Sequence, residues 1–321
     1  MSKTTSVSLV ADIGGTNTRV ALADGQIVRE DTVMRFSNAD YPGLESVLRT
    51  YLADIGTPKT DAVCVAVAGP VRDGRATMTN LDWTMDKDTL ARASGASRVA
   101  LLNDLQAQGH AVGYIDQKNL RPILTGTESN EHAAKLVIGV GTGFNSAPVF
   151  ETAAGRLVTP SESGHASLPI RTETELRLCA FVSTAHGFPA IEDVLSGRGL
   201  ERVYAWLGAE ANDPREISAA QIMQACQDGS DPRATEAARV FVQMLGKVAG
   251  DLSLVQLPFG GVYLVGGVAR AIAPYLGTFG FAEAFRDKGR FAGFMGNFSV
   301  TVVEDDYAAL VGCAAHVASG H

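Results

Sequence analysis

Three glycine-rich turns, each at the end of an apolar segment, constrain this chain more than any other feature. The first lies in residues 8–21, where an apolar run reaches Asp12, crosses a Gly-Gly pair and is followed by a second apolar run. Glycine adopts backbone angles closed to other residues, so main-chain N–H groups of such a turn can converge on a phosphate. The candidate phosphate-binding residues are Gly14, Gly15, Thr16 and Asn17.

The Asp12 carboxylate, at the end of the first apolar run, could hold Mg²⁺ directly or through water. An ordinary tight turn with Asn and Asp in routine roles explains the same residues equally well. Residues elsewhere in the chain are needed to distinguish these two interpretations.

Two later turns resemble the first. Gly141, Thr142 and Gly143 follow Leu-Val-Ile and precede Ala-Pro-Val-Phe, and this echo suggests two related α/β halves. Gly266 and Gly267 end the apolar segment 262–265, where a Gly pair permits close approach of a ring or a ribose. None of the turns matches the Gly-x-x-x-x-Gly-Lys-Ser/Thr loop, and the first lacks the Gly-x-Gly-x-x-Gly pattern of dinucleotide folds.

Length and composition indicate a globular protein of about two domains, since the chain has 321 residues, 46% of them apolar and 19% charged. The net charge of −8 argues against a protein that grips nucleic acid through a basic face. It does not argue against a nucleotide, because backbone N–H groups and helix N-termini hold phosphates without a basic surface.

Targeting and redox signals are sparse. The polar residues 1–7 leave no room for a signal segment and no run approaches ~18 apolar residues, so we expect a cytoplasmic protein without a membrane span. The scattered cysteines show no zinc spacing and predict reduced core thiols. They are Cys64, Cys179, Cys226 and Cys313.

The order of apolar segments and helical patterns predicts an α/β fold. We expect strands in each half around the first two glycine turns, and helices mainly in the second half. Expected strands include 27–36, 62–68, 100–102, 262–265 and 299–303; expected helices are 42–54, 172–185, 191–206, 217–228, 232–255 and 308–317.

Asn103 and Asp104 stand where an apolar strand passes into a helix. A carboxylate there is favoured by the helix dipole, so helix capping explains Asp104 without any function. The functional interpretation is a general base that takes the proton of a substrate hydroxyl as that oxygen attacks the γ-phosphate. Asn103 would offer a donor and an acceptor to neighbouring hydroxyls.

A carboxylate and an imidazole, Glu162 and His165, lie three residues apart in a segment of small residues. This spacing suits a loop that binds a polyol, although such a pair is usually an exposed surface pair without a function. Metal binding is disfavoured because the other His residues form no ligand spacing. Glu192, ahead of a helical pattern, is either a further binding carboxylate or an ordinary first-turn acid.

At this point the chain resembles the bacterial glucokinases, of the hexokinase class whose fold is shared with actin and the heat-shock ATPases. The resemblance runs essentially from end to end. The motifs that carry it are Asp12-Ile-Gly-Gly-Thr-Asn-Thr-Arg, Met78-Thr-Asn80 with Trp83, Leu102-Asn-Asp104, Gly141-Thr-Gly, Glu162 with Gly164-His165, Val194-Leu-Ser-Gly-Arg-Gly-Leu, Gly266-Gly267 and Asp287-Lys-Gly-Arg-Phe291.

The resemblance implies a two-lobed, ribonuclease-H-like ATPase fold of the actin and hexokinase type. Its domains would be 1–108 plus 302–321 and 109–301. It further implies ATP and Mg²⁺ as cofactors, a homodimer, phosphate loops at the Asp12 and Gly141 turns, and an adenosine loop at the third turn. By the same resemblance Asp104 is the base, and the residues that line the sugar are Asn80, Asn103, Asp104, Glu162, His165 and Glu192.

The chain also departs from the family pattern. The family usually reads Gly-Thr-Gly-Leu-Gly at the second loop, where this chain has Phe144 and Asn145, and Gly is frequent where Ser161 and Ser163 stand. These differences bear on sugar specificity more than on the reaction. The cysteine-rich zinc segment of the related repressor and sugar-kinase (ROK) family is absent, as is an N-terminal DNA-binding domain.

The predicted function is ATP-dependent phosphorylation of the 6-hydroxyl of glucose. Two alternatives stay open at this point: a kinase of another hexose, such as fructose or an amino sugar, and a non-catalytic sensor of sugar or nucleotide. A sensor needs contacts to hydroxyls but no base, so the presence of Asp104 favours the enzyme.

Overall fold

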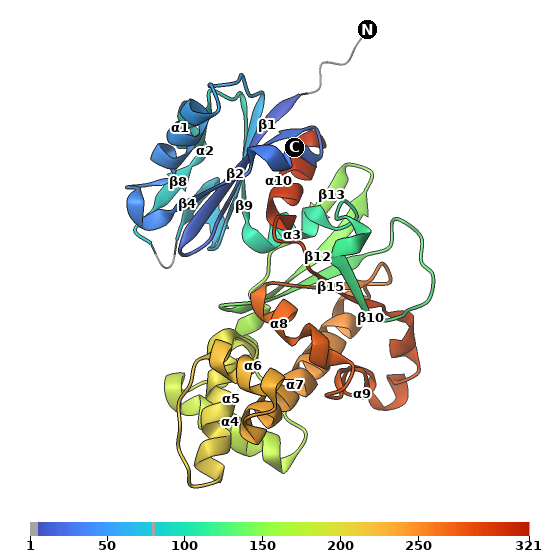
Figure 1. Ribbon diagram of the computed structural model, residues 1–321. Helices are drawn as coiled ribbons and strands as arrows, with labels where there is room; N and C mark the ends of the chain where they lie inside the picture. Colours follow the sequence, from blue (N-terminus) through green and yellow to red (C-terminus); the bar gives the residue numbers. More distant parts are fainter. Residues whose placement is uncertain (1–5, 79–80, 321) are drawn as a thin grey trace. The chain divides into compact units, whose positions relative to one another are not determined.

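The computed structural model describes residues 6–78 and 81–320 of the chain (Figure 1). Contacts divide the chain into two compact units. The first comprises Met1–Gln117, Ala153–Val158 and Asp305–His321, and the second comprises Lys118–Thr152 and Thr159–Glu304. The functional domain limits expected at 108 and 302 stay a prediction.

A twisted sheet forms the centre of the first unit. Its strands lie in the order β3-β2-β1-β5-β9, with β4 beside β2. The first two strands are an antiparallel hairpin, whereas β1, β5 and β9 run parallel. The strands are β1 (Val7–Ile13), β2 (Asn17–Asp24), β3 (Ile27–Val28), β4 (Met34–Ser37), β5 (Ala62–Val67) and β9 (Arg98–Asn103).

Helices cover both faces of this sheet because alternate strand residues point to opposite sides. Leu9, Ala11 and Ile13 belong to one apolar core, which α1 and α2 complete. Val10 belongs to a second core with residues of α3 and α10, the C-terminal helix shown in red in Figure 1. These helices are α1 (Leu44–Asp54), α2 (Lys87–Ser94), α3 (Asp104–Ala111) and α10 (Ala308–Ala318).

Short strands complete the first unit. A three-stranded antiparallel sheet consists of β6 (Val71–Arg72), β7 (Arg75–Thr77) and β8 (Thr84–Asp86). Strand β13 (Gly155–Val158) contacts α3. The Arg156 guanidinium donates to the carbonyl oxygen of His110 at 2.9 Å and fixes this segment to the end of that helix.

The second unit has its own sheet, with β10-β15-β14-β11-β12 in that order. Here β11 and β12 form the antiparallel hairpin, while β11, β14 and β15 run parallel. The long helix α7 is buried in the core of this unit. The strands are β10 (Leu120–Leu124), β11 (Lys135–Val140), β12 (Phe144–Thr152), β14 (Val262–Val265) and β15 (Val300–Val303).

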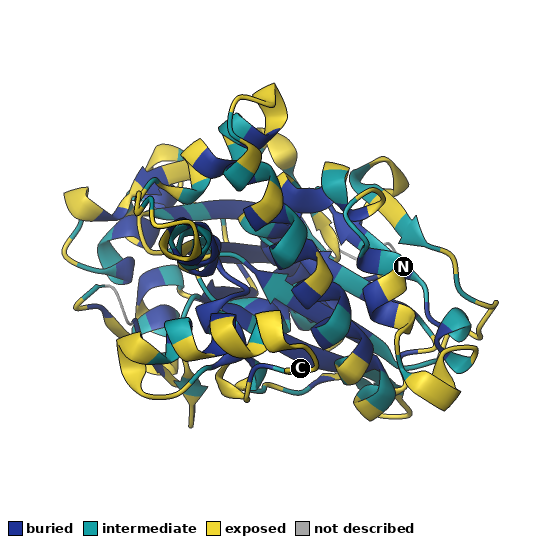
Figure 2. Ribbon diagram, turned by 90° about the horizontal axis from the view of Figure 1, so that it is seen from below, coloured by how far each residue is buried: buried dark blue, intermediate teal, exposed yellow. Residues whose placement is uncertain are grey.

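The helices of the second unit pack mostly against α7 and this sheet. They are α4 (Glu173–His186), α5 (Gly197–Glu210), α6 (Ala219–Asp228), α7 (Pro232–Gln256), α8 (Gly267–Leu276) and α9 (Phe281–Arg286). Figure 2 shows buried residues concentrated along the strands and exposed residues on the outward faces of the helices.

The two sheets share one topology. In each sheet, two strands form an antiparallel hairpin with a glycine turn at its tip. Two further strands lie beside the first strand of that hairpin and run parallel to it. The echo between the first two glycine turns therefore reflects two related α/β halves, as the sequence suggested.

Most predicted elements are present, with three corrections. The strand expected over 27–36 is two short strands separated by the 3₁₀ turn Glu30–Thr32. The helix expected from 191 begins only at Gly197, after a separate 3₁₀ turn, Ile191–Asp193. Helices α2 and α9 were not expected; both are short, at 8 and 6 residues, so their apolar periodicity is weak.

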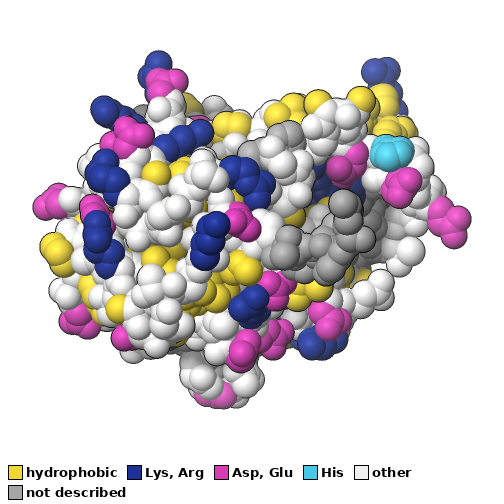
Figure 3. Space-filling view, turned by 90° about the horizontal axis from the view of Figure 1, so that it is seen from above, with side chains coloured by type: hydrophobic (Ala, Val, Ile, Leu, Met, Phe, Trp, Pro, Cys, Tyr) yellow, Lys and Arg dark blue, Asp and Glu magenta, His cyan; other side chains and the backbone are white. Residues whose placement is uncertain are grey.

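Three features of the structure bear on the predictions from composition. All four cysteines are buried free thiols. In residues 6–78 and 81–320, no helix combines the length and apolar character that crossing a membrane requires. On the face drawn in Figure 3, Lys and Arg side chains are interspersed with Asp and Glu.

Candidate active site

A buried residue, Asn38, stabilises the glycine turn of the first unit by hydrogen bonds. Its side-chain amide donates to the Gly14 carbonyl at 2.8 Å, and its backbone N–H donates to the Thr16 carbonyl at 2.9 Å. The Thr18 hydroxyl donates to Asn38 Oδ1 at 2.7 Å. These bonds occupy the carbonyls of Gly14 and Thr16. Gly15 and Thr16, at the tip of the turn, are exposed. Sequence reasoning missed Asn38, since no local pattern links it to a turn more than twenty residues earlier.

Parallel strand ends bring the first carboxylate and the strand-helix junction to the same edge of the sheet. Ile13, next to Asp12, and Asn103 are both in register with Val67 of the intervening strand β5. Asp12 lies on the strand end beside the turn, with Arg19 Nη1 at 3.4 Å from its Oδ2. The first glycine turn and the start of α3 therefore share the carboxyl edge of one sheet.

Asn103, and not Asp104, is the N-cap residue of α3. Its Oδ1 accepts from the Leu105 N–H at 3.0 Å, and the Gln106 side chain accepts from its backbone N–H at 3.2 Å, which completes a capping box. The Asn103 amide also donates to the Gly69 carbonyl at 3.0 Å. These bonds leave one amide N–H of Asn103 for a hydroxyl.

Asp104 is the first helical residue of α3, and its half-buried carboxylate shares the Leu105 N–H at 2.8 Å. The pKa of Asp104 is raised from 3.8 to about 6, first by burial and second by the negative charge of Asp12. The pKa of Asp12 is itself raised by burial, against the opposing effect of Arg19. Since Asn103 fills the capping role, capping does not account for a carboxylate in this costly position.

In the second unit, Glu192 stabilises the Gly141–Gly143 turn. Its Oε2 accepts from the Phe144 N–H at 2.9 Å, and a Cβ at Gly143 would collide with the same oxygen. Arg198 Nη2 lies 3.9 Å from the other carboxylate oxygen. Glu192 therefore supports the turn. It is also a first-turn acid, but of the 3₁₀ helix Ile191–Asp193 and not of α5, which begins five residues later.

The third glycine turn lies beside the second. Gly266 has a φ of 104°, and a Cβ there would meet the Val140 carbonyl oxygen at 2.5 Å, so the position requires glycine. The N–H of Gly197 donates to the Gly141 carbonyl at 2.9 Å, which ties the start of α5 to the second turn. Val268, in the first turn of α8, is the other neighbour of Gly197. The N-termini of α5 and α8 thus both lie beside the second glycine turn.

Glu162 and His165 project from a 3₁₀ turn that packs on the start of β12. Both side chains are exposed, with His165 Nε2 4.0 Å from Glu162 Oε2. A Cβ at Gly164, between them, would collide with the Phe144 carbonyl oxygen. The loop therefore lies directly on the strand that follows the second glycine turn, and the side chains of Glu162 and His165 are exposed to solvent.

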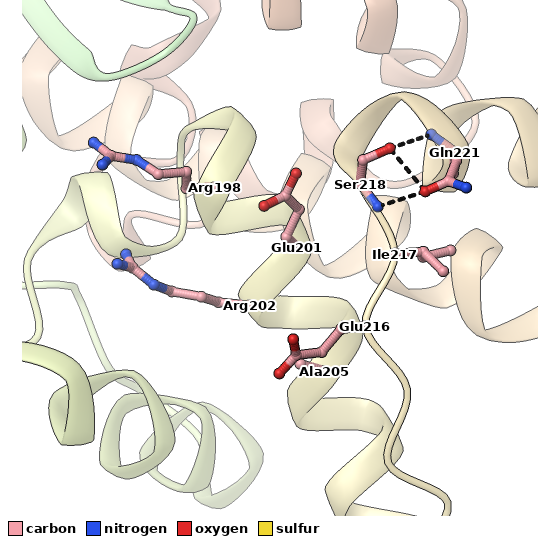
Figure 4. A pocket seen from close by; sticks show the side chains of 8 residues that line it. All are labelled: Arg198, Glu201, Arg202, Ala205, Glu216, Ile217, Ser218 and Gln221. Carbon is pink, nitrogen blue, oxygen red and sulfur yellow. Dashed lines mark hydrogen bonds between the residues drawn. The ribbon is translucent and has the colours of Figure 1, made fainter. Parts of the chain in front are cut away.

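A pocket of about 550 Å³ lies along α5, and its first lining residue in the chain is Arg198, next to Gly197 (Figure 4). Arg198 and Arg202 extend from the same side of the helix. The Glu201 carboxylate accepts from the first N–H of α6, that of Ala219, at 2.8 Å. Arg198 belongs to a motif singled out in the sequence, whereas no local pattern pointed to the opposite wall. The lining residues are Arg198, Glu201, Arg202, Ala205, Glu216, Ile217, Ser218 and Gln221.

Comparison with known proteins decides the family. The glucokinase family model matches residues 9–320. The glucokinase of Saccharophagus degradans is 31% identical over 311 residues, covering 96% of this chain and 97% of its own. The chain belongs to the glucokinase family.

Solved structures of the family agree. The crystal structure of a glucokinase from an Antarctic psychrotroph has a TM-score of 0.86 at 31% identity, covering 97% of this chain and 98% of its own. A ROK-family glucokinase from Streptomyces griseus, solved with glucose and AMPPNP, has a TM-score of 0.63 at 21% identity and covers 98% of this chain and all of its own. The expected actin-like ATPase fold is confirmed.

For this member of the glucokinase family, the structure groups the predicted site residues by unit. In the first unit it brings the Asp12 turn together with Asn103 and Asp104. In the second it gathers the other two glycine turns with Glu192. Asn80 lies outside the described residues. The ligand roles assigned to all of these residues stay predictions.

Proposed function

We propose that the protein transfers the γ-phosphoryl group of ATP to the 6-hydroxyl of glucose, with Asp104 as the general base. The observation that carries this proposal is the shared strand edge of the first unit. There a glycine turn with exposed amides lies close to a carboxylate whose pKa of about 6 suits proton transfer near neutral pH. Membership of the glucokinase family supports the choice of substrates.

Asp104 would act on the sugar hydroxyl as the new bond forms. The O6–H proton passes to the Asp104 carboxylate, the O6 lone pair attacks the γ-phosphorus, and the bond from that phosphorus to the bridging oxygen breaks to release ADP. At pH 7 a group with a pKa of about 6 is mostly ionised, yet it is more basic than an ordinary aspartate. The Leu105 N–H holds the carboxylate in place while the sugar binds.

The glycine turns would bind the phosphates of the nucleotide. Gly14, Gly15, Thr16 and Asn17 supply the first phosphate loop and Gly141, Thr142 and Gly143 the second, with Gly266 and Gly267 at the adenosine end. The start of α8 beside the second loop adds the favourable end of a helix dipole and its unpaired first N–H groups. Neutral donors of this kind agree with a net charge of −8.

Asp12 fits a role in holding Mg²⁺. Its carboxylate is partly buried, and burial raises its pKa, so a cation would offset the cost of its charge. Within the described residues no cluster of three or more His, Cys, Asp or Glu could bind a metal alone, which agrees with an ion held by one carboxylate and the nucleotide phosphates. When bound, Mg²⁺ supplies positive charge to the phosphates.

The pocket along α5 is the position that we assign to the nucleoside. Its lining residue Arg198 follows Gly197, the neighbour of the second glycine turn and of Val268 in α8, and its volume of about 550 Å³ lies within the usual range for small-molecule sites. Arg198 and Arg202 offer planar guanidinium groups against which a base can stack.

We assign to the sugar the exposed carboxylate and imidazole of Glu162 and His165 in the second unit and, in the first unit, a side-chain N–H of Asn103. Glu192 would contact the sugar through Oε1, which lies 3.9 Å from Arg198 Nη2, because Oε2 holds the turn. Asn80 is assigned to the sugar by family resemblance alone.

The test is steady-state turnover measured by ADP release with MgATP and a panel of glucose, fructose and amino sugars, repeated with ADP and polyphosphate as donors. We expect the highest kcat/KM with glucose and MgATP. A higher value with another hexose would replace glucose by that sugar. Binding of glucose without turnover of any sugar would instead indicate a sensor.

A further inference from the structure

Asn145 is the centre of a hydrogen-bond cluster that joins the second phosphate turn to the Glu162–His165 loop. It lies two residues after Gly143 on β12. Its Oδ1 accepts from the backbone N–H groups of Ser146 at 2.8 Å and Ser163 at 3.0 Å, and the Ser161 hydroxyl oxygen lies 3.0 Å from it. The cluster thus connects a strand with a loop almost twenty residues later in the chain.

The amide end of the same side chain faces acceptors. Asn145 Nδ2 donates to the Ser161 carbonyl and lies 3.5 Å from Glu162 Oε2. Backbone N–H groups can pair only with the amide oxygen, and a carbonyl only with the amide nitrogen, so the surroundings determine the orientation of the side chain. An asparagine satisfies both sets of partners, whereas an aspartate would satisfy only the donors.

Serine hydroxyls strengthen this cluster. The buried Ser146 hydroxyl donates to the Ser163 hydroxyl at 2.8 Å, and the Ser161 hydroxyl donates to the Ser146 carbonyl at 2.7 Å. The residues that depart from the family pattern, Asn145, Ser161 and Ser163, are therefore direct partners. They act as one unit that replaces the flexibility of glycine by specific hydrogen bonds.

We propose that Asn145 is a positioning residue for the sugar: its Oδ1 holds the Ser161–His165 loop on β12, and its Nδ2 orients the Glu162 carboxylate toward the hydroxyls of the hexose. This rests on the proposed function for its ligand. The carboxylate is exposed, so its orientation depends on such a neighbour. Because Asn145 lies two residues after the phosphate turn, strand β12 positions both the Ser161–His165 loop and the phosphate loop.

Two substitutions separate the roles of the two amide ends. Asn145→Asp keeps the acceptor for the Ser163 N–H, removes the donor and places a negative charge beside Glu162. Asn145→Ala removes both. We expect both variants to bind glucose about tenfold more weakly by calorimetry, with the KM for ATP within about twofold of the unmodified protein. Amide hydrogen exchange at Ser163 should accelerate about tenfold in the Ala variant and stay unchanged in the Asp variant.

Asn130→Asp is the matched control, because Asn130 is exposed and its Oδ1 likewise accepts a backbone N–H, that of His132. It makes the same change of charge in the same unit and should leave glucose binding unchanged. Glucose affinity within twofold of the unmodified protein in Asn145→Asp would overturn the orienting role, and unchanged exchange at Ser163 in Asn145→Ala would overturn the loop-holding role.

Failure of the proposed function gives a different result. If the unmodified protein does not bind glucose at all, the ligand assignment is wrong and the orienting role falls with it. Hydrogen exchange at Ser163 then still decides whether Asn145 holds the loop, because that measurement needs no sugar.

Discussion

Replacing Asp104 by Asn should make the protein more stable and nearly inactive. The amide has the shape of the carboxylate and can still accept the Leu105 N–H, but it carries no charge and cannot serve as a base at neutral pH. We expect kcat to fall by about 10²-fold or more, with sugar affinity within roughly tenfold.

The gain in stability follows from the pKa of the carboxyl group. A rise from 3.8 to about 6 is a difference of about 2 pH units between unfolded and folded states, which corresponds to at most ~3 kcal/mol. Because the folded pKa is the higher one, the folded state binds the proton more tightly. The contribution of this group is therefore fully present below pH 4 and is lost as the pH rises through 6. The Asn variant has no such loss.

Thermal unfolding between pH 4 and 7.5 and coupled kinetics measure the two effects. The Tm of the variant should match the unmodified protein near pH 4 and exceed it increasingly toward neutrality. In the unmodified protein, log kcat/KM should fall below an apparent pKa of about 6. Asp88→Asn, at an exposed first-turn position of α2, is the control and should change neither measurement.

Two results would refute this reasoning. Near-normal turnover in Asp104→Asn would remove the base. A stability difference between the variant and the unmodified protein that does not change with pH would show that the carboxylate is not destabilised by its surroundings.

Four further substitutions, one of them a control, test other parts of the site. Asn38→Ala, which removes the donor to Gly14, should cost about 2 kcal/mol of stability and raise the KM for ATP; chemical denaturation and kinetics check both, and an unchanged KM would contradict a role in the phosphate loop. Gly266→Ala should lower the Tm because of its φ of 104°, at a cost of about 1–3 kcal/mol, whereas Gly267→Ala, whose Cβ meets no described atom within 4 Å, should fold normally. Ala205→Phe should fill the α5 pocket and raise the KM for ATP without altering glucose affinity by calorimetry; equal KM values would place the nucleoside elsewhere.

The glycine turns and Asp104 illustrate what local sequence can reveal. An apolar run that stops at a Gly pair predicts a strand followed by a turn, and the positions of Gly14, Gly141 and Gly266 were all expected. Asp104 was expected at the start of a helix, and it is there. Its distinction from a helix cap was not predictable, because both Asn103 and Asp104 suit that role by residue type.

Partners distant in the sequence were the part that could not be predicted. Asn38 lies in an unremarkable polar segment, yet it holds the first turn. His110 and His316 show no ligand spacing, yet their ring nitrogens lie 3.1 Å apart between α3 and α10. In the sequence, Asn145 and Ser163 are two separate differences from the family pattern. The structure makes them partners, because the loop that carries Ser163 lies on β12.

The sequence by itself determined the class of the fold, the three turns and the residue types available for phosphoryl transfer, because backbone freedom and strand periodicity act over a few neighbouring residues. Only the tertiary structure decided which side chains are buried, which carboxylate has a raised pKa and which amides hold the loops. Those properties depend on desolvation and on hydrogen bonds between segments that meet only when the sheets and helices have packed.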